Sequence, residues 1–511
     1  MVTPPRSGTT VTAFIDYVDY YKAIGETLAR IAPNGVVVVA GWAIDLNTPI
    51  PSDGGMVGIG SLLARKGKEG CRVRVLLSGH INGPNTDAAN WLNSQKGCAA
   101  IVDDRVLLAG CFHQKSVVAE LSSGTVAFLG GMDFGAERLA APDRAPWHDV
   151  QVKLEGPAAV DVFDTLADRW TTHQAANSFA HFALPRSNAK AVPSQRGCVA
   201  QVVKTYGNPR SNVPLTKLRP TIPSLTASPF LSFGSSPNPL AEFGFAPRGN
   251  SSIHDLLVRA IQSTEEYIYL EDQYFVASAE MARDRLLLRS LAKTISKPNF
   301  KHLIVLTCGV GTIQSELLQT NRRRRALWDV LGSVHPDKIS VWCYKNGTDR
   351  CYWQHSKTWI FDDRFALVGS ANFNRRGLSH DGELGVGFMD LSAGTGNSLP
   401  FPHDLRIRLW MKHLSTPRRP LLRDQLIDFS GARKFWTEAE GSFLARLDVV
   451  NGDPFQADRL LKVDPAPPSA GFWEKLFVGA GRKVQDLYKW SVNEQQNFAN
   501  QWDYVLDPDG S

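Results

Sequence analysis

The sequence lacks any hydrophobic run long enough to cross a membrane. Its longest apolar stretch extends from Val36 to Ile44, whereas a membrane-spanning helix needs about 20 consecutive apolar residues. The N-terminal residues also lack the apolar core of a Sec signal peptide. We therefore expect no transmembrane segment, and either a cytoplasmic protein or one exported by a leaderless route.

Cysteine is scarce, and its positions follow no paired pattern. The chain has 7 cysteines, an odd number, with no Cys-x-x-Cys pair and no spacing typical of a metal site. This pattern favours reduced, buried thiols over a disulfide framework. The sequence therefore predicts no disulfides.

An excess of charge of one sign is also lacking. The 56 basic residues nearly balance the 50 acidic ones and leave a net charge of +6, which is compatible with an anionic substrate but does not require one. With 43% hydrophobic and 21% charged residues, the composition excludes a disordered, collagen-like or coiled-coil chain. At about 150 residues per domain, the length of 511 residues allows two to four folded units.

Segments with the pattern of strands alternate with segments that have the pattern of helices. In the first part of the chain, β-branched runs predict buried strands at 36–46 and 72–78, with a helix at 61–68 between them. The other predicted elements of this part are helices at 14–31 and 158–172 and strands near 104–109, 114–121, 125–130 and 148–154. The alternation predicts an α/β fold with mixed sheets.

A change of composition divides the chain. Residues 208–250 are rich in proline, serine and glycine without a sustained period, which is typical of a linker or a surface lid. We expect an N-terminal half at 1–207, a C-terminal half at 251–430, and an extension at 431–511 that packs on the core. The predicted elements of the second half are helices at 252–266 and 281–295 and strands at 267–270 and 302–307.

The triplet His-x-Lys stands once in each half, as His113 with Lys115 and as His355 with Lys357. In a chain with 12 histidines and 56 basic residues, the bare pair of triplets carries little information. The surroundings repeat as well, however, since an acidic residue and then a segment of small residues follow each triplet. These are Glu120 and 130–133 (GGMD) in the first half, and Asp362 and 369–372 (GSAN) in the second.

The spacing of the second copy has a physical interpretation. Alternation along a strand places His355 and Lys357 on one face. If a hairpin turn begins at Asp362, the returning strand brings Ser370 and Asn372 back beside them. A histidine, a fixed cation and two hydrogen-bonding groups suit the binding of a phosphate and need no metal.

The duplicated motif resembles that of the phospholipase D superfamily, and the resemblance covers most of the chain. Segments 147–157, 267–275, 405–414 and 502–508 are also similar to long bacterial-type members. There are departures, because Glu120 stands where the family usually has aspartate, and Asp133 stands opposite Asn372. The resemblance implies two pseudo-repeated α/β halves with the active site at their interface.

The resemblance also implies roles for the paired residues. One histidine attacks phosphorus and the other protonates the leaving alcohol, so that a phosphohistidine forms. By analogy His113 is the nucleophile and His355 the general acid, an order that the sequence leaves open. Lys115 and Lys357 would neutralise the non-bridging oxygens, to which Asn372 and Ser370 would donate.

The remaining candidate residues are expected to hold this machinery in place. Each histidine needs a partner on its other ring nitrogen, and the candidates are Asp149, in the same half as His113, and Glu383, in the same half as His355. Gly131 and Asp133 are expected to contact substrate, whereas Glu120 and Asp362 are expected to support turns. No metal and no cofactor are expected.

The function implied by the resemblance is that of a phospholipase D, which hydrolyses the distal phosphodiester of glycerophospholipids to phosphatidate and the free headgroup, with possible transfer to alcohols. The alternatives are a nucleic-acid phosphodiesterase, a cardiolipin-synthase-like phosphatidyltransferase and a catalytically silent binding module. The expected partner is a phospholipid, met by a monomer that contacts the membrane surface peripherally. Residues 471–490 are partly amphipathic and either dock on the core or contact the membrane.

Overall fold

The computed structural model of the 511-residue chain covers most of both predicted halves. It describes residues 2–79, 84–105, 110–142, 145–178, 184, 191–194, 197–208, 244–277, 282–308, 327, 330–344, 353–391, 399–416, 419–439 and 444–447. Most of the expected linker at 208–250 and most of the expected extension at 431–511 lie outside the described residues, so both stay predictions. The predicted strand at 104–109 also lies largely outside them.

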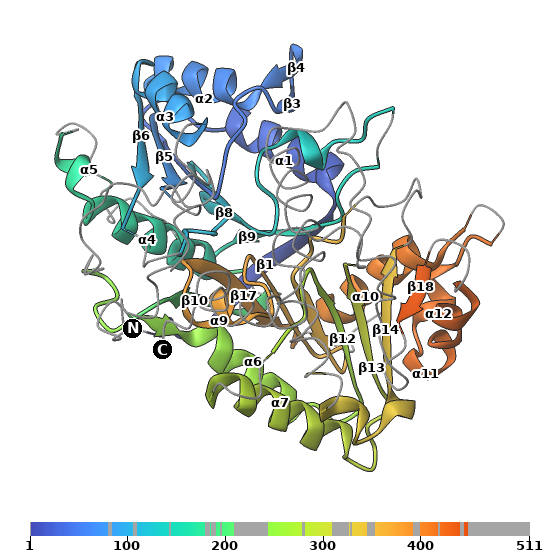
Figure 1. The fold of residues 1–511 in the computed structure, drawn as a ribbon. Helices are drawn as coiled ribbons and strands as arrows, with labels where there is room; N and C mark the ends of the chain where they lie inside the picture. The colour runs from blue at the N-terminus through green and yellow to red at the C-terminus, as the bar shows by residue number, and fades with distance from the viewer. Residues whose placement is uncertain are drawn as a thin grey trace, which may run out of the picture.

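A single mixed sheet of 16 strands runs through both halves (Figure 1). The first half supplies β1 (Arg6–Ile15), β2 (Val36–Gly41), β5 (Arg72–Ser78), β6 (Cys98–Asp103), β7 (Ser116–Leu121), β8 (Gly124–Gly130) and β9 (Val150–Glu155). Strand β10 (Cys198–Tyr206) precedes the boundary predicted at residue 207, yet it pairs with β17 and belongs to the sheet of the second half. The second half also supplies β11 (Asn250–Ser251), β12 (Tyr267–Asp272), β13 (His302–Thr307), β14 (Ile339–Tyr344), β15 (Thr358–Phe361), β16 (Phe365–Gly369), β17 (Glu383–Met389) and, beyond its predicted end at 430, β18 (Leu444–Leu447). A separate hairpin consists of β3 (Pro49–Ser52) and β4 (Gly55–Gly58).

The strand order repeats about the centre of the sheet. From the middle outward, the first half runs β1-β9-β8-β7-β2-β5-β6, and the second runs β10-β17-β16-β15-β12-β13-β14 before β18 at the edge. In each half the last three of these seven strands are parallel to one another, and the others pair antiparallel. The antiparallel pair β1–β10 joins the halves. The expectation of two pseudo-repeated α/β halves with mixed sheets is confirmed.

Helices occupy the connections that parallel strands require, since a parallel neighbour can be reached only by a crossover. The longer helices of the first half are α1 (Tyr17–Ala29), α2 (Ile59–Lys68), α3 (Pro84–Asn93) and α4 (Pro157–Thr171). Those of the second half are α6 (Ser252–Ser263), α7 (Ala282–Ile295) and α10 (Phe401–Leu414). Short helical segments are α5 (Gln174–Ser178), α9 (Arg375–Ser379), α11 (Phe429–Ala432), α12 (Lys434–Ala439), η1 (Ala136–Arg138), η6 (Pro336–Lys338) and η7 (Arg423–Leu426).

Most of the predicted elements exist, and the errors have local causes. The predicted strands at 72–78 and 302–307 coincide with β5 and β13. The predicted helix at 14–31 is wrong at its start, because Phe14 and Ile15 end β1 and the backbone turns at Asp16, where φ is 63°. The predicted strand at 36–46 ends early, at Gly41, because the chain leaves the sheet there.

One hydrophobic core extends across both halves. It contains Val11 of β1 and Ala200 of β10, together with Trp170 of α4 and Trp410 of α10. A second cluster lies within the first half, a third lies in the second half but includes Trp147, and a small fourth joins Phe112 to Tyr206 and Ala246. The β1–β10 junction itself is partly open to solvent, because Ser7 is exposed and Arg6 half-buried, whereas Thr9 and Ala200 are buried.

Buried histidines predict the response of the fold to acid. Burial lowers the pKa of His302 to about 3, and Arg433 and Arg446 add to this effect. Below about pH 6.5 this histidine binds a proton in the unfolded chain but not in the folded one. The free energy of unfolding therefore falls by about 1.4 kcal/mol per pH unit as the pH drops from 6.5 towards 5. We therefore expect His302→Gln to lessen the loss of the free energy of unfolding between pH 7 and pH 5, measured by urea titration.

The matched control is His335→Gln, because the His335 side chain is 41% exposed. This variant should keep the acid sensitivity of the parent protein. An equal response of both variants would contradict the role assigned to the buried imidazole of His302.

Candidate active site

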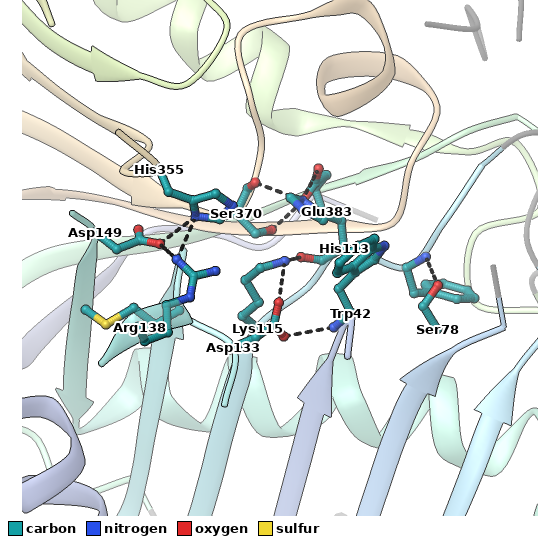
Figure 2. Close-up of polar contacts among 12 residues, drawn as sticks. Trp42, Ser78, His113, Lys115, Asp133, Arg138, Asp149, His355, Ser370 and Glu383 are labelled. Atoms are coloured by element: carbon teal, nitrogen blue, oxygen red, sulfur yellow. Dashed lines mark hydrogen bonds and ion pairs between the residues drawn. The ribbon is translucent and has the colours of Figure 1, made fainter. Parts of the chain in front are cut away.

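The two predicted histidines lie at the interface of the halves, in equivalent segments. His113 precedes β7 and His355 precedes β15, and these strands occupy equivalent places in the repeat. Figure 2 shows both rings among polar side chains from both halves. The His355 side chain is 7% exposed and that of His113 is 15% exposed. The site is therefore enclosed but open to a ligand at His113.

Short parallel bridges join each histidine-bearing segment to the other half. In one bridge His113 N–H donates to Gly382 O at 2.8 Å, and Gly382 N–H donates to Cys111 O at 2.8 Å. The equivalent bonds of the other bridge run from His355 N–H to His148 O and from His148 N–H to Trp353 O, both at 2.9 Å. The backbone thus fixes each histidine relative to the opposite half.

The carboxylate partners of the histidines are exchanged between the halves. His113 Nδ1 lies 3.0 Å from Glu383 Oε1, and His355 Nδ1 lies 2.6 Å from Asp149 Oδ2. Asp149 and Glu383 are the expected orienting residues, but the expectation that each serves the histidine of its own half is wrong. The bridges supply the reason, because the bridging residues His148 and Gly382 immediately precede Asp149 and Glu383.

The two carboxylates have different supports. Glu383 accepts a hydrogen bond from the Ser370 hydroxyl, whereas Asp149 accepts one from Arg138 at 2.8 Å. The expectation that Ser370 donates to substrate is therefore corrected, since its hydroxyl binds Glu383 and its carbonyl oxygen lies 3.1 Å from His113 Nδ1. Arg138 was not predicted, because a single arginine in an irregular segment carries no sequence pattern. One histidine thus has a cation behind its carboxylate and the other a neutral hydroxyl.

The two lysines are buried, and they also differ. The side chain of Lys115 is 1% exposed, and its ammonium group lies 3.2 Å from Asp133 Oδ2. Lys357 Nζ donates to the neutral oxygen Oε1 of Gln273 at 3.2 Å. Burial lowers the pKa of Lys357 to about 7, an effect that nearby Asp149 opposes and Lys115 reinforces. Of the two lysines, Lys357 therefore has less negative charge beside its ammonium group, and it is the one next to which an anion would bind.

Asp133 and Gly131 act on the site indirectly. The Asp133 carboxylate forms an ion pair with Lys115 and accepts the Trp42 backbone N–H at 3.0 Å, so the expectation that it contacts substrate is corrected. A Cβ atom at Gly131 would lie 2.0 Å from Asp149 Oδ1. Glycine at 131 therefore leaves the space that the Asp149 carboxylate occupies, and its contact with substrate stays a prediction.

The amide of Asn372 retains a place in the predicted site. Its side chain is buried, and Oδ1 has no hydrogen-bond partner among the residues that the structure describes. A buried polar atom without a partner is costly, so it marks a position where a ligand or water can bind. An unpartnered amide oxygen suits a donor such as water or an alcohol hydroxyl, and the donation of Asn372 to a phosphate oxygen stays a prediction.

The two acidic residues of the motifs lie outside this constellation. The Asp362 carboxylate accepts the backbone N–H groups of residues 265–267 at 2.8–2.9 Å, in the turn between β15 and β16. Glu120 pairs with Thr125 across the β7–β8 hairpin. Both residues belong to hairpins, as the sequence predicts, and the hairpin turn expected at Asp362 is present with φ of 52°.

An aromatic wall encloses His355. The Trp147 ring stacks on Trp353 with centroids 5.4 Å apart, lies 5.3 Å from the His355 ring, and contacts the Arg138 guanidinium at 4.7 Å. Burial lowers the pKa of His355 well below its usual value, and the cations Lys357, Arg138 and Lys115 add to the shift. His355 is therefore neutral at pH 7 when no anion is bound, and its Nδ1–H donates to Asp149.

The charge state predicts proton uptake when an anion binds. A phosphate between the lysines would offset the cations that lower the pKa values of His355 and Lys357, so both pKa values rise towards their ordinary values. We expect the protein to take up about one proton per site when inorganic phosphate or tungstate binds at pH 7. Titration calorimetry in buffers of different ionisation enthalpy measures this number, and a binding enthalpy independent of the buffer would contradict the assigned charges.

The arrangement suits transfer of a phosphoryl group. With both Nδ1 atoms held by carboxylates, the Nε2 atom of each histidine is the one left to react with a ligand or exchange a proton with it. Two buried ammonium groups from opposite halves supply the positive charge that a phosphodiester requires.

Among the described residues, no helix is long and apolar enough to span a membrane.

Comparisons with known proteins point to one family. The family model described as phospholipase D matches residues 137–208, and the model described as cardiolipin synthase, PLD-like domain, matches residues 257–390. Phospholipase D alpha 4 of Arabidopsis thaliana is 24% identical over 77% of this chain and 63% of its own length. Phospholipase D beta 2 of the same plant is 22% identical over 86% of this chain and 62% of its own. The chain thus spans less than two thirds of the length of these relatives.

The fold has a counterpart among solved structures. The phosphatidylserine synthase of Haemophilus influenzae Rd KW20 superposes with a TM-score of 0.54 at 11% identity, covering 99% of this chain and 97% of its own. This likeness concerns the fold alone. Each family match includes one of the exchanged carboxylates, Asp149 in the first and Glu383 in the second. The duplicated motif, the repeated sheet and these matches together identify the chain as a member of the phospholipase D superfamily.

Proposed function

We propose that the protein is a phosphodiesterase of the phospholipase D type, which hydrolyses the distal phosphodiester of glycerophospholipids to phosphatidate and free headgroup. The observation that carries the proposal is the exchanged pair of histidine–carboxylate contacts around two buried lysines. The plant relatives named phospholipase D support a phospholipid as the substrate. We further propose that a monomer meets this substrate by peripheral contact with the membrane surface.

The proposed reaction has two steps. First, Nε2 of His113 attacks phosphorus, the bond from phosphorus to the headgroup oxygen breaks, and Nε2–H of His355 gives its proton to that oxygen. Second, His355 removes a proton from water, and the resulting hydroxide displaces His113 from phosphorus. Lys115 and Lys357 stabilise the charge on the non-bridging oxygens in both steps. A primary alcohol in place of water yields the transfer product.

The protonation state of His355 fits the order of these events. The free site holds His355 neutral, because burial and the surrounding cations lower its pKa. The negative phosphodiester supplies the charge that restores its pKa, so His355 becomes an acid only when substrate is bound. This coupling supports the assignment of His355 as the general acid and His113 as the nucleophile.

A phosphatidyltransferase of the cardiolipin-synthase kind is the second candidate. It is favoured by the family model that matches residues 257–390. The same phosphohistidine would form, and the acceptor would be the hydroxyl of a second lipid instead of water. The two functions therefore differ in the acceptor and share the residues of the site.

Incubation with defined lipids tests the proposal. Purified protein in EDTA is given vesicles of phosphatidylcholine, phosphatidylethanolamine or phosphatidylglycerol with 1-butanol, and products are separated by mass spectrometry. We expect phosphatidate and phosphatidylbutanol, with neither formed by His113→Asn. Formation of cardiolipin from phosphatidylglycerol without phosphatidate would favour the transferase, and cleavage of single-stranded DNA without any lipid product would overturn the lipid assignment.

A further inference from the structure

A buried polar network links the two halves directly behind Asp149. Its members come from the β1–α1 junction, the segment before β9, strands β12 and β14, and helix α10. They are Asp16, His148, Tyr269, Glu271, Tyr344, Lys412 and His413. The side chains of His148, Glu271 and His413 are all 0% exposed. The reaction proposed above uses none of these residues, so their burial calls for an explanation.

His148 is held by a carboxylate on each ring nitrogen. Nδ1 lies 2.8 Å from Asp16 Oδ1, and Nε2 lies 2.8 Å from Glu271 Oε2. Two acceptors facing the two ring nitrogens favour a doubly protonated imidazolium. Burial and Lys412 oppose this charged form, but Glu271 and Asp16 outweigh them, so the pKa of His148 is raised.

His413, in contrast, is neutral. Its Nε2 donates to Glu271 Oε1 at 2.8 Å, and its Nδ1 accepts from the Tyr344 hydroxyl. Burial lowers the pKa of His413 to about 4 against the influence of Glu271. Lys412 forms an ion pair with Asp16, so two anions, Asp16 and Glu271, are balanced by two cations, Lys412 and His148.

The same atoms meet the spacing of a metal site, because ligand atoms of His148, Glu271 and His413 lie within 4.8 Å of one another. The surroundings oppose a cation there. Lys412 Nζ lies 2.8 Å from His148 Nδ1, and the Tyr269 hydroxyl donates to Glu271 Oε1 at 2.6 Å. A protonated imidazole with an ammonium neighbour cannot serve as a metal ligand, so the cluster is better described as a set of hydrogen bonds.

The network contacts the catalytic carboxylate through the main chain. Asp149 N–H donates to Asp16 Oδ1 at 3.2 Å, and Asp16 N–H donates to Asp149 O at 2.9 Å. The His148 backbone in turn forms the bridge to Trp353 and His355. The Asp16 backbone has φ of 63° and ψ of −177°, a conformation that is strained in residues other than glycine. Strain of this kind persists only where the surrounding contacts hold the residue firmly.

The network around His148 lies on one side of the repeat. The equivalent bridge of the other half uses Gly382 in place of His148, and glycine has no side chain through which a network could hold Glu383. The Glu383 side is supported differently, since Asp381 accepts Cys111 N–H and pairs with Arg376, and Gln114 joins Glu383 O to Arg169. The two sides thus differ in that an imidazole stands directly beside Asp149, whereas glycine stands beside Glu383.

We propose that Asp16, His148 and Glu271 are positioning residues, which set the Asp149 carboxylate against His355 Nδ1 and so favour proton transfer without contacting substrate. The catalytic part of this inference rests on the proposed function. The structural part, which is the alignment of Asp149 with His355, does not depend on any substrate. The two parts can therefore be tested separately.

The structural part is tested by the ring resonances of the histidines. In protein labelled with ¹⁵N-histidine at pH 7, we expect His148 to show two protonated nitrogens, and His355 to show a low-field Nδ1 proton that identifies itself by its absence in His355→Asn. The variant Glu271→Gln keeps the side-chain size but removes the charge. It should lose or shift the His355 signal, whereas the surface variant Glu438→Gln should keep it.

The catalytic part is tested by steady-state kinetics on vesicles of phosphatidylcholine. We expect Glu271→Gln to lower kcat by about 10- to 100-fold, as is typical of residues that orient a reactive group, with KM unchanged. If this variant does not fold, Asp16→Asn is measured in its place, since it removes the charge on the other nitrogen of His148.

Three results would overturn the inference. They are an unchanged His355 signal in a folded Glu271→Gln or Asp16→Asn variant, an equal rise of KM and fall of kcat in that variant, and a stoichiometric metal ion released from the native protein by acid. Absence of lipid turnover in the parent protein, with the His355 signal present and sensitive to Glu271→Gln, would reject the proposed function and keep the positioning role.

Discussion

Replacement of either site histidine, as in His113→Asn or His355→Asn, is expected to lower turnover of a phosphodiester by at least about 10³-fold, because the residues act as one unit. Asparagine can accept or donate a hydrogen bond at the Nδ1 position but offers neither a nucleophile nor an acid at Nε2. Each variant should therefore keep the fold while it loses the reaction. Initial rates on short-chain phosphatidylcholine, with thermal unfolding as a check on the fold, measure both quantities.

The matched control for these variants is His335→Asn, which replaces an exposed histidine outside both motifs. It should retain the activity of the parent protein. Near-normal turnover by either site variant would show that the reaction needs only one histidine. Phosphohistidine is hydrolysed in acid, so the trapped phosphate should be located by mass spectrometry at alkaline pH. We expect it on His113.

The exchanged carboxylates predict which histidine each acid serves. An alkyl headgroup leaves poorly without a proton, whereas p-nitrophenolate leaves well without one. Loss of the general acid therefore harms cleavage of a choline ester more than cleavage of a p-nitrophenyl ester, and loss of the nucleophile harms both. We expect Asp149→Asn to follow His355→Asn in this respect, with about 10²-fold less activity on the choline ester and under about 10-fold less in the first release of p-nitrophenolate, which precedes the step in which His355 activates water.

Glu383→Gln provides the complementary comparison. Its carboxylate contacts His113, so it should lose about 10²-fold on both esters, as a weakened version of His113→Asn. The comparison of each carboxylate variant with a histidine variant holds whichever histidine is the nucleophile. If Asp149→Asn followed His113→Asn instead, the carboxylates would serve the histidines of their own halves and the observed pairing would be wrong.

The repeat could be predicted from the sequence because it is written in local patterns. The two copies of His-x-Lys, the acidic residue that follows each, and the β-branched runs at 36–46 and 72–78 each occupy a few neighbouring residues. Such patterns report the period of a strand and the place of a turn. They define which residues are reactive and on which strand they lie.

The contacts between the halves could not be predicted in the same way. Whether Asp149 faces His113 or His355 depends on the register of two bridges that join residues 206 positions apart in the second case. Arg138 likewise contacts His355 of the other half, and the hydroxyl of Ser370 contacts Glu383, 13 residues away on another strand. Short apolar strands such as β6 and β17 were also missed, since a brief run buried on both faces has no alternation to mark it.

The exchange of carboxylates has a consequence for the newly made chain. Neither half contains a histidine together with the acid that orients it, because His113 relies on Glu383 and His355 on Asp149. A chain whose first half has folded while the second is still being synthesised therefore holds an unoriented imidazole and no acid catalyst. Cleavage of phosphodiesters should begin only once both halves have docked. The pairing of each histidine with the carboxylate of the other half therefore makes activity depend on completion of the fold.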